Sequence, residues 1–166
     1  MPCLTKHSDR ASSGSSDCQN PSGTDCSWYS RCLRIPVSCD VESGGNITAK
    51  VEKLCSSSRQ SYTRFSSRGK DWVNTMLKCS QERLVPTLQQ TPSCRVLRVR
   101  SVTTFVSCCM SPSAQAPGLC DLPIEDLRLI KDIVFSSLDL EVLSNLAQEI
   151  KVPLSRGCLE KLLQLL

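Results

Sequence analysis

The sequence predicts an all-α fold, with disulfide-linked helical hairpins or a small bundle behind a flexible N-terminal tail. Two observations support this prediction. Apolar residues recur at helical spacing from Ile47 onward. Cys55, Cys79, Cys94 and Cys108 follow one another at wide intervals that contain these apolar residues. Such spacing suits cross-links between helices, whereas a metal knuckle needs a Cys-x2-Cys pair, which this sequence lacks. We therefore expect neither a metal nor a cofactor.

The cysteine content indicates an oxidising compartment. The 166 residues include twelve cysteines but only three Phe, two Trp and two Tyr, and a core so poor in aromatic residues gains from covalent cross-links. An even number of cysteines spread along the chain favours a disulfide framework. The cysteines expected to form it are Cys26, Cys32, Cys39, Cys55, Cys79, Cys94, Cys108, Cys109, Cys120 and Cys158.

These features predict a secreted, extracellular protein. The first residues lack the apolar run of a signal peptide, so we expect the leader to be absent from this chain. No stretch approaches the roughly 20 apolar residues of a membrane span. The net charge of +4 is a mild excess that does not by itself indicate nucleic acid.

Composition divides the chain into three parts. Residues 1–25 are rich in Ser, Gly, Asp and Pro and predict a flexible tail, which Cys3 or Cys18 can anchor. Its histidine, His7, is expected to be solvated rather than catalytic. Residues 26–120 form the cysteine-rich helical domain, and residues 121–166 form a C-terminal helical segment.

The cysteine-rich domain is expected to open with a short helix after Cys26, which Pro36 stops. Its Trp28-Tyr29 pair suits core packing better than a ligand cage. Asn46 begins the only Asn-x-Ser/Thr sequon without an intervening proline and is a candidate glycosylation site; the alternative is a plain helix N-cap.

Two helices should follow. One apolar stripe runs from Ile47 to Phe65, and a second runs from Trp72 to Leu84, where Pro86 ends it. We expect Gly69 to break the helix, so that a Ser-Ser-Arg-Gly turn joins the two into a hairpin.

The third segment, residues 95–106, is rich in β-branched residues and is equally compatible with a strand. Cys94, Leu97, Phe105 and Cys108 can share one helical face. The neighbouring helices and cross-links favour a helix, because tertiary context overrides a weak local preference.

Basic residues gather in the first and third of these segments. They can form a patch for a sulfated glycan or an acidic protein partner, although a simple solvated face is the more common explanation of such residues. No nucleic-acid module is visible, so we expect no nucleic-acid partner. The candidate binding residues are Arg59, Arg64, Arg68, Lys70, Arg95, Arg98 and Arg100.

The C-terminal segment predicts three helices. The first opens near Pro123, the second covers 140–150, and the third covers 158–166 and ends in leucines. This apolar terminus is expected to dock on a partner or on the core. If residues 122–166 instead line an apolar cavity, the chain is a lipid-binding or membrane-active helical protein, which is the second functional hypothesis.

Catalytic motifs are absent from the sequence. There is no Gly-rich phosphate loop, no His-Glu-x2-His and no Gly-x-Ser-x-Gly motif. Met110 and the Ser-Pro-Ser that follow the Cys108-Cys109 doublet cannot supply a general base, and oxidised cysteines are not nucleophiles. We therefore predict no catalytic residues and a protein that is not an enzyme.

The stretch between Cys55 and Cys79 resembles a known family. With the cysteines at 94 and 108, and the earlier Cys26, Cys32 and Cys39 near the sequon, it resembles the stanniocalcin family of secreted glycoprotein hormones over roughly residues 26–120. The Cys108-Cys109 doublet, Cys3 and Cys18 fall outside that pattern. The residues that carry the resemblance are Tyr62, Phe65, Gly69, Lys70, Trp72, Val73, Leu77, Lys78 and Cys79.

The resemblance implies a helical, N-glycosylated hormone that acts on an extracellular protein partner or receptor. It implies a role in calcium and phosphate regulation or in the inhibition of a secreted metalloprotease. By position it implies a Cys79–Cys108 bond and a bond from Cys94 to Cys32 or Cys39. It also implies a disulfide-linked homodimer, for which Cys158 is our candidate interchain cysteine.

Overall fold

A computed structural model of the chain describes residues 16–33, 47–90, 92–138, 144 and 155–165. These residues form helices joined by short loops, with no strand among them, so the predicted all-α class is confirmed. The longer helices are α4 (Ile47–Gln60), α5 (Ser67–Leu84), α6 (Cys94–Met110) and α7 (Ile124–Ser137). The shorter elements are α1 (Ser16–Gln19), α2 (Trp28–Cys32), α9 (Arg156–Leu163), and the 3-10 turns η1 (Tyr62–Arg64), η2 (Val85–Gln89) and η3 (Leu119–Asp121).

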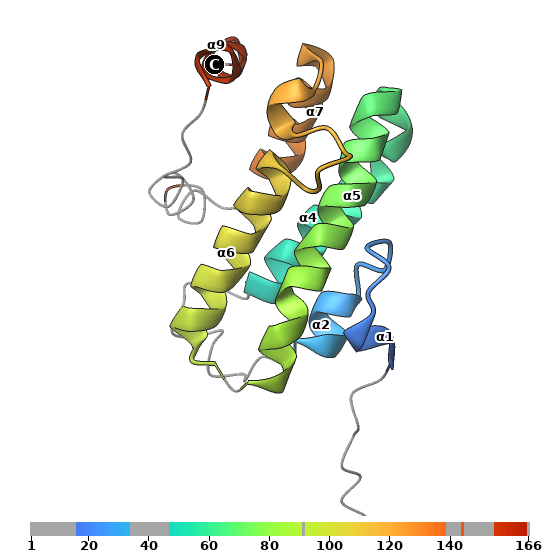
Figure 1. Cartoon of the computed structure of the whole chain (residues 1–166), viewed down its shortest axis with the longest axis vertical. Coiled ribbons are helices and arrows are strands. Elements are labelled where there is room, and N and C mark those ends of the chain that lie inside the picture. The colour runs from blue at the N-terminus through green and yellow to red at the C-terminus, as the bar shows by residue number, and fades with distance from the viewer. Residues whose placement is uncertain (1–15, 34–46, 91, 139–143, 145–154, 166) are drawn as a thin grey trace, which may run out of the picture.

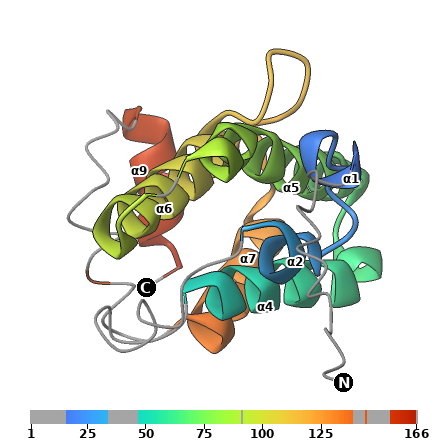
Figure 2. The ribbon, with the colours of Figure 1, turned by 90° about the horizontal axis from the view of Figure 1, so that it is seen from below.

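The long helices form two layers. α5 packs against α6, whereas α4 packs against α7 and α2 (Figures 1 and 2). α5 and α6 run antiparallel, joined through η2 (Figure 1). The expected hairpin of α4 with α5 is therefore the weaker pairing, because each of the two helices packs mainly against a later one.

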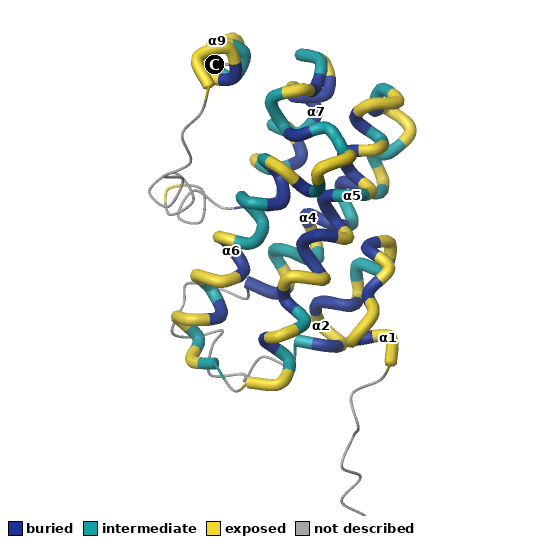
Figure 3. Tube along the Cα trace, in the orientation of Figure 1, coloured by how far each residue is buried: buried dark blue, intermediate teal, exposed yellow. Residues whose placement is uncertain are grey.

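The core lies between these layers. Figure 3 shows buried positions along α5, α4 and α2, whereas α9 is mostly exposed. Trp28 and Tyr29 are each 1 % exposed and meet edge to face, with ring centroids 5.5 Å apart. The Trp28 indole N–H donates to the Cys18 carbonyl at 3.3 Å. The prediction that this aromatic pair belongs to the core is confirmed.

The prediction that Gly69 breaks a helix is wrong. Gly69 lies inside the first turn of α5, where its backbone N–H donates to the Ser66 hydroxyl at 3.0 Å. Ser66 is thus the N-cap residue. A Cβ at Gly69 would lie 2.7 Å from Cγ of Asp126 on α7. Glycine is needed here because another helix approaches closely, and not because the chain turns.

The segment at 95–106 is helical, as the tertiary argument predicted. α6 begins after Ser93, whose hydroxyl accepts from the Val96 N–H, and it buries Leu97 and Val102. Near its end, the Cys109 carbonyl accepts from the Trp72 indole of α5 at 2.9 Å. Contacts with α5 therefore outweigh the strand preference of its β-branched residues.

Part of the region expected to be a tail belongs to the fold. Residues 16–25 carry α1 and are held by the buried side chain of Gln81 on α5. The Gln81 amide accepts from the Gly23 N–H at 3.0 Å and donates to the Asp25 carbonyl at 2.8 Å. The folded part of the chain therefore begins before residue 26, where the sequence placed the start of the helical domain. Amino-acid composition cannot reveal two hydrogen bonds to a glutamine that lies far along the chain.

Four disulfide bonds cross-link the described residues. They are Cys18–Cys32, Cys26–Cys55, Cys79–Cys108 and Cys120–Cys158. Cys94 is also disulfide-bonded. The Cys79–Cys108 bond that the resemblance implies is present. The implied bond between Cys94 and Cys32 is excluded because Cys32 pairs with Cys18.

Two further cysteine predictions are wrong. Cys109 is a buried free thiol and not part of a disulfide. Cys158 is bonded to Cys120 in the same chain, so it cannot make the interchain bond. Some predictions concern residues that the structure does not describe: Cys3, His7, Cys39 and Asn46 of the sequon. Of the helix expected at 140–150, only residue 144 is described.

Within the ranges given above, no helix combines the length and apolar character needed to cross a bilayer.

Candidate functional site

Four of the seven predicted binding residues gather at one end of the molecule. Arg59 lies in the last turn of α4, Arg64 lies in η1, and Arg68 and Lys70 lie in the first turns of α5. Arg59 and Lys70 contact the ring of Tyr62, which lies in η1 between the two helices, and Arg64 and Arg68 are exposed in the same stretch of chain. We call these five residues the Tyr62 surface.

The centre of the Tyr62 surface has a defined geometry. The guanidinium carbon of Arg59 lies 4.8 Å from the centroid of the Tyr62 ring, and Nζ of Lys70 lies 6.0 Å from the same centroid. Asn74 fixes the arrangement: its Oδ1 accepts from Arg59 at 2.8 Å, and its Nδ2 donates to the Tyr62 hydroxyl at 2.8 Å. The Arg59 and Lys70 positions are cation–π contacts.

Sequence reasoning missed Asn74. It follows Lys70 by four residues and so lies on the same face of α5, a spacing that can be read from the sequence. The sequence predicts a turn between the two helices, but it does not indicate which face of α5 this turn places against the end of α4.

Among the described residues, no carboxylate forms an ion pair with the four cations of the Tyr62 surface. In the part of the chain that the structure describes, the ion pairs are Arg31–Asp25, Lys78–Glu82 and Arg156–Glu160, and each lies elsewhere. The nearest acid in the sequence is Asp71, which is exposed and adjacent to Lys70. The surface therefore carries a net positive charge and can attract an anionic group.

A buried carboxylate anchors the Tyr62 surface to the rest of the fold. Asp126 of α7 is 2 % exposed and accepts from the Ser66 N–H at 2.9 Å and from the Ser66 hydroxyl at 2.5 Å. The Cys26–Cys55 disulfide ties α4 to the segment before α2. The three elements that carry the cations are thus fixed by contacts beneath them.

The other three predicted binding residues lie elsewhere. Arg95, Arg98 and Arg100 are in the first two turns of α6, which begins beside the C-terminal end of α5 (Figure 1). The Tyr62 surface lies at the opposite, N-terminal end of α5. Arg100 donates to the Gln90 side chain at 2.7 Å. The structure therefore does not bring the seven residues into one patch.

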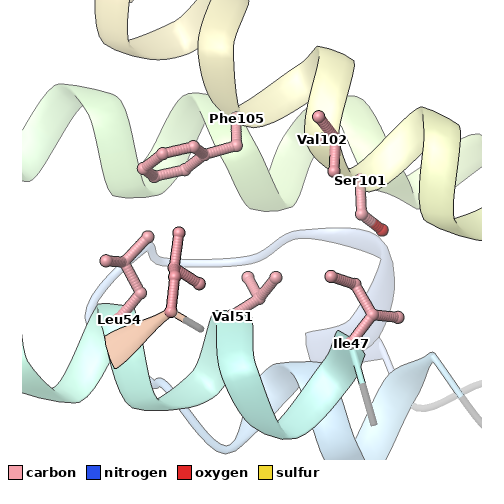
Figure 4. Close-up of a pocket in the computed structure, with 7 residues that line it drawn as sticks. Ile47, Val51, Leu54, Ser101, Val102 and Phe105 are labelled. Atoms are coloured by element: carbon pink, nitrogen blue, oxygen red, sulfur yellow. The ribbon is translucent and has the colours of Figure 1, made fainter. Parts of the chain in front are cut away.

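An apolar pocket opens between the two layers. Figure 4 shows side chains of α4 facing side chains of α6 across it, and the space measures about 270 Å³, including the part open to solvent. A second pocket, of about 220 Å³ when the part open to solvent is included, shares two residues with the first and extends toward Trp72 and Met76 of α5. The residues lining the first pocket are Ile47, Val51, Leu54, Ser101, Val102, Phe105 and Leu138.

The lining of this pocket is apolar except for Ser101, so it favours apolar groups over polar ones. Its lining comes mainly from α4 and α6, whereas the lipid hypothesis expected residues 122–166. From that segment, Leu138 lines the first pocket, and Ile130, Ile133 and Val134 line the second.

The C-terminal leucines divide between the interior and the surface. Leu165 packs against the core, whereas Leu159 and Leu163 of α9 are 46 % and 55 % exposed. α9 is held by the Cys120–Cys158 bond, and Nζ of Lys161 donates to the Cys120 carbonyl at 2.9 Å. The exposed leucines form a second, apolar candidate surface.

The free thiol of Cys109 is chemically quiet. Burial raises its pKa well above the ordinary value of 9.0, so it stays protonated at neutral pH. Burial also raises the pKa of Tyr29, and the nearby Cys109 adds to that shift. A protonated, buried thiol is a poor nucleophile, and this pair is part of the core.

Comparison with protein-family models, with curated proteins and with solved structures finds no match for this chain. The fold and the cross-links define its class as an all-helical protein with multiple disulfides. That combination fits an extracellular protein, because disulfides persist in oxidising compartments.

Proposed function

We propose that this chain is a secreted, hormone-like protein of the stanniocalcin type that acts by binding an extracellular protein. The observation that carries the proposal is the set of four disulfides, which join segments 14 to 38 residues apart. Cross-links that involve α2, α4, α5, α6 and α9 keep surface residues in fixed positions in an oxidising environment, where disulfides persist.

The positions of the motif residues support the stanniocalcin-like part of the proposal. Phe65, Trp72 and Val73 are at most 3 % exposed and form the core. Tyr62 and Lys70 lie at the surface, in contact with each other. The motif thus combines buried core residues with residues at the surface. Its last residue, Cys79, links α5 to α6 through the bond to Cys108.

The cysteines limit how two copies of this chain can be linked covalently. Cys158 is used within the chain and Cys109 is buried, so neither can link two copies. If a covalent homodimer exists, its bond uses a cysteine outside the described residues. Non-reducing electrophoresis compared with reducing electrophoresis decides between monomer and covalent dimer.

The activity is tested with a panel of secreted metalloproteases. We expect the purified, oxidised protein to slow cleavage of a protein substrate by at least one of them, and to lose this effect after reduction and alkylation. Reduced protein is the matched control, because it has the same composition without the fixed fold. Equal cleavage rates with oxidised and reduced protein would contradict inhibition through a disulfide-held surface.

The apolar pocket favours a second candidate function, the binding of a lipid or membrane surface. Phe105 contributes to both cavities, so Phe105→Ala should enlarge them and alter any uptake of hydrocarbon. Co-sedimentation with vesicles containing an anionic phospholipid tests this function. Protein that stays in the supernatant at low ionic strength excludes it.

A further inference from the structure

We propose that the Tyr62 surface binds a sulfated glycan chain, and that this binding is separate from recognition of the protein partner. The inference rests on the extracellular location in the proposed function, since sulfated polysaccharides are the polyanions of that environment. The glycan would hold the protein at the cell surface or in the matrix, near the protein on which it acts.

The first argument is electrostatic. Arg59 and Lys70 both lie against one aromatic ring, with no carboxylate paired to either among the described residues. Both cations lie within 6.0 Å of the same ring centroid, so the positive potential is raised around this ring. A nearby anionic group lowers that potential, so the site favours binding of an anion.

The second argument is preorganisation. Asn74 holds the Arg59 guanidinium and the Tyr62 hydroxyl through two hydrogen bonds of 2.8 Å, and Asp126 fixes the η1–α5 junction through Ser66. Binding therefore requires little additional ordering of these side chains, which lowers its entropic cost. The guanidinium fork suits the oxygens of sulfate, which can accept two parallel hydrogen bonds.

The third argument concerns the extent of the surface. Arg64 and Arg68 are exposed and belong to the same stretch of chain, residues 59–70, so the four cations come from three successive elements. A single small anion can contact only part of such a surface. A linear polyanion with repeated sulfates can contact all of it, which favours a polysaccharide.

Single-stranded nucleic acid suits the site less well. Binding of such strands relies on aromatic rings on which bases stack. Arg59 already lies over the Tyr62 ring, at 4.8 Å from its centroid, and takes the place that a base would need. An oligonucleotide therefore serves as a competitor in the test.

The chain provides a matched pair of variants. R64A/R68A removes two exposed arginines from the Tyr62 surface, and R95A/R100A removes two exposed arginines from α6 at the other end of α5. Both variants have the same net charge. We measure binding of a heparin octasaccharide by titration calorimetry, and we check folding by circular dichroism and by the absence of reactive thiols.

We expect R64A/R68A to weaken octasaccharide binding by about tenfold or more and to elute from immobilised heparin at lower salt. R95A/R100A should keep its affinity within about twofold. Arg59→Lys, which keeps the charge but loses the guanidinium fork, should also weaken binding.

Three results would overturn the inference. They are equal losses in the two double variants, unchanged binding of chemically desulfated heparin, and tighter binding of a single-stranded oligonucleotide than of the octasaccharide. Failure of the proposed function is distinguishable, because it would appear as absence of secretion or as free thiols at the cysteines of the four disulfides. Neither outcome alters an affinity measured on the purified protein.

Discussion

At the scale of single residues, local chemistry was only partly visible in the sequence. The burial of Trp28 and Tyr29 could be predicted because their aromatic area is large and few other aromatic residues are available. The role of Gly69 could not, because it depends on Asp126, which lies on another helix. The sequence also could not show that Cys109 is a free thiol, because geometry and not the number of cysteines decides which cysteines form disulfides.

The close approach at Gly69 leads to a stability prediction. Gly69→Ala should destabilise the protein by about 1–3 kcal/mol, because the new methyl group would meet the Asp126 carboxylate, which is buried and hydrogen-bonded to Ser66. Gly157→Ala is the matched control: it lies in α9 with nothing within 4 Å of the new Cβ. Alanine there should stabilise the helix by about 0.5–1 kcal/mol.

Urea unfolding of both glycine variants checks this prediction. If the two substitutions change the free energy of unfolding in the same direction, the close approach of Asp126 is not what requires glycine at position 69.

The buried Cys109 thiol predicts a pH dependence. Its pKa is raised in the folded state, so the unfolded chain loses this proton at lower pH than the folded protein does. The free energy of unfolding should therefore be constant below about pH 8 and fall as the pH rises through 9.0, by up to about 1.4 kcal/mol per pH unit for one group. Tyr29, with an ordinary value of 10.0, extends the loss to higher pH.

Cys109→Ala removes the first of these groups. Urea unfolding between about pH 7 and pH 9.5 should show a shallower loss in this variant than in the parent protein. If the free energy of unfolding falls equally steeply with pH in the variant and in the parent protein, then Cys109 has the same pKa in the folded and the unfolded chain, and this account is wrong.

At the scale of elements, helical periodicity predicted the right class but did not predict which helix pairings are the most extensive. The apolar positions of α5 could be read from their spacing, and all of those named, from Trp72 to Leu84, are buried. The two-layer arrangement decides that α5 packs mainly on α6 and α4 on α7. The local sequence of each helix does not indicate this arrangement. Residues 16–25 are held partly by the Cys18–Cys32 bond, an anchor that the sequence allowed. They are also held by Gln81, whose role depends on a contact far along the chain and could not be predicted.

Gln81→Ala tests how the N-terminal segment is held. The substitution leaves the Gly23 N–H and the Asp25 carbonyl without their partner, and we expect a cost of about 1–3 kcal/mol. Hydrogen exchange measured by mass spectrometry should speed up in residues 20–29, while α6 stays protected. Faster exchange that is uniform over α6 and the N-terminal segment would show that Gln81 supports the whole core instead.

At the scale of the whole molecule, the disulfides are the feature that connects fold, compartment and function. A cross-link that closes a loop of 14 to 38 residues stabilises a protein by about 3–4 kcal/mol. The sequence predicted the framework from composition. It could not predict the pairing, and the structure replaces the expected Cys109 bond and Cys158 interchain bond with a buried thiol and a bond to Cys120.

The most direct test of this account is a map of cysteine oxidation in the native protein. Thiols are alkylated under native conditions, then again after unfolding, and then with a distinguishable reagent after reduction, before peptide mass spectrometry. We expect Cys109 to react only after unfolding, and the eight cysteines of the four disulfides only after reduction. Labelling of those eight without reduction would contradict the disulfide framework and, with it, the extracellular function.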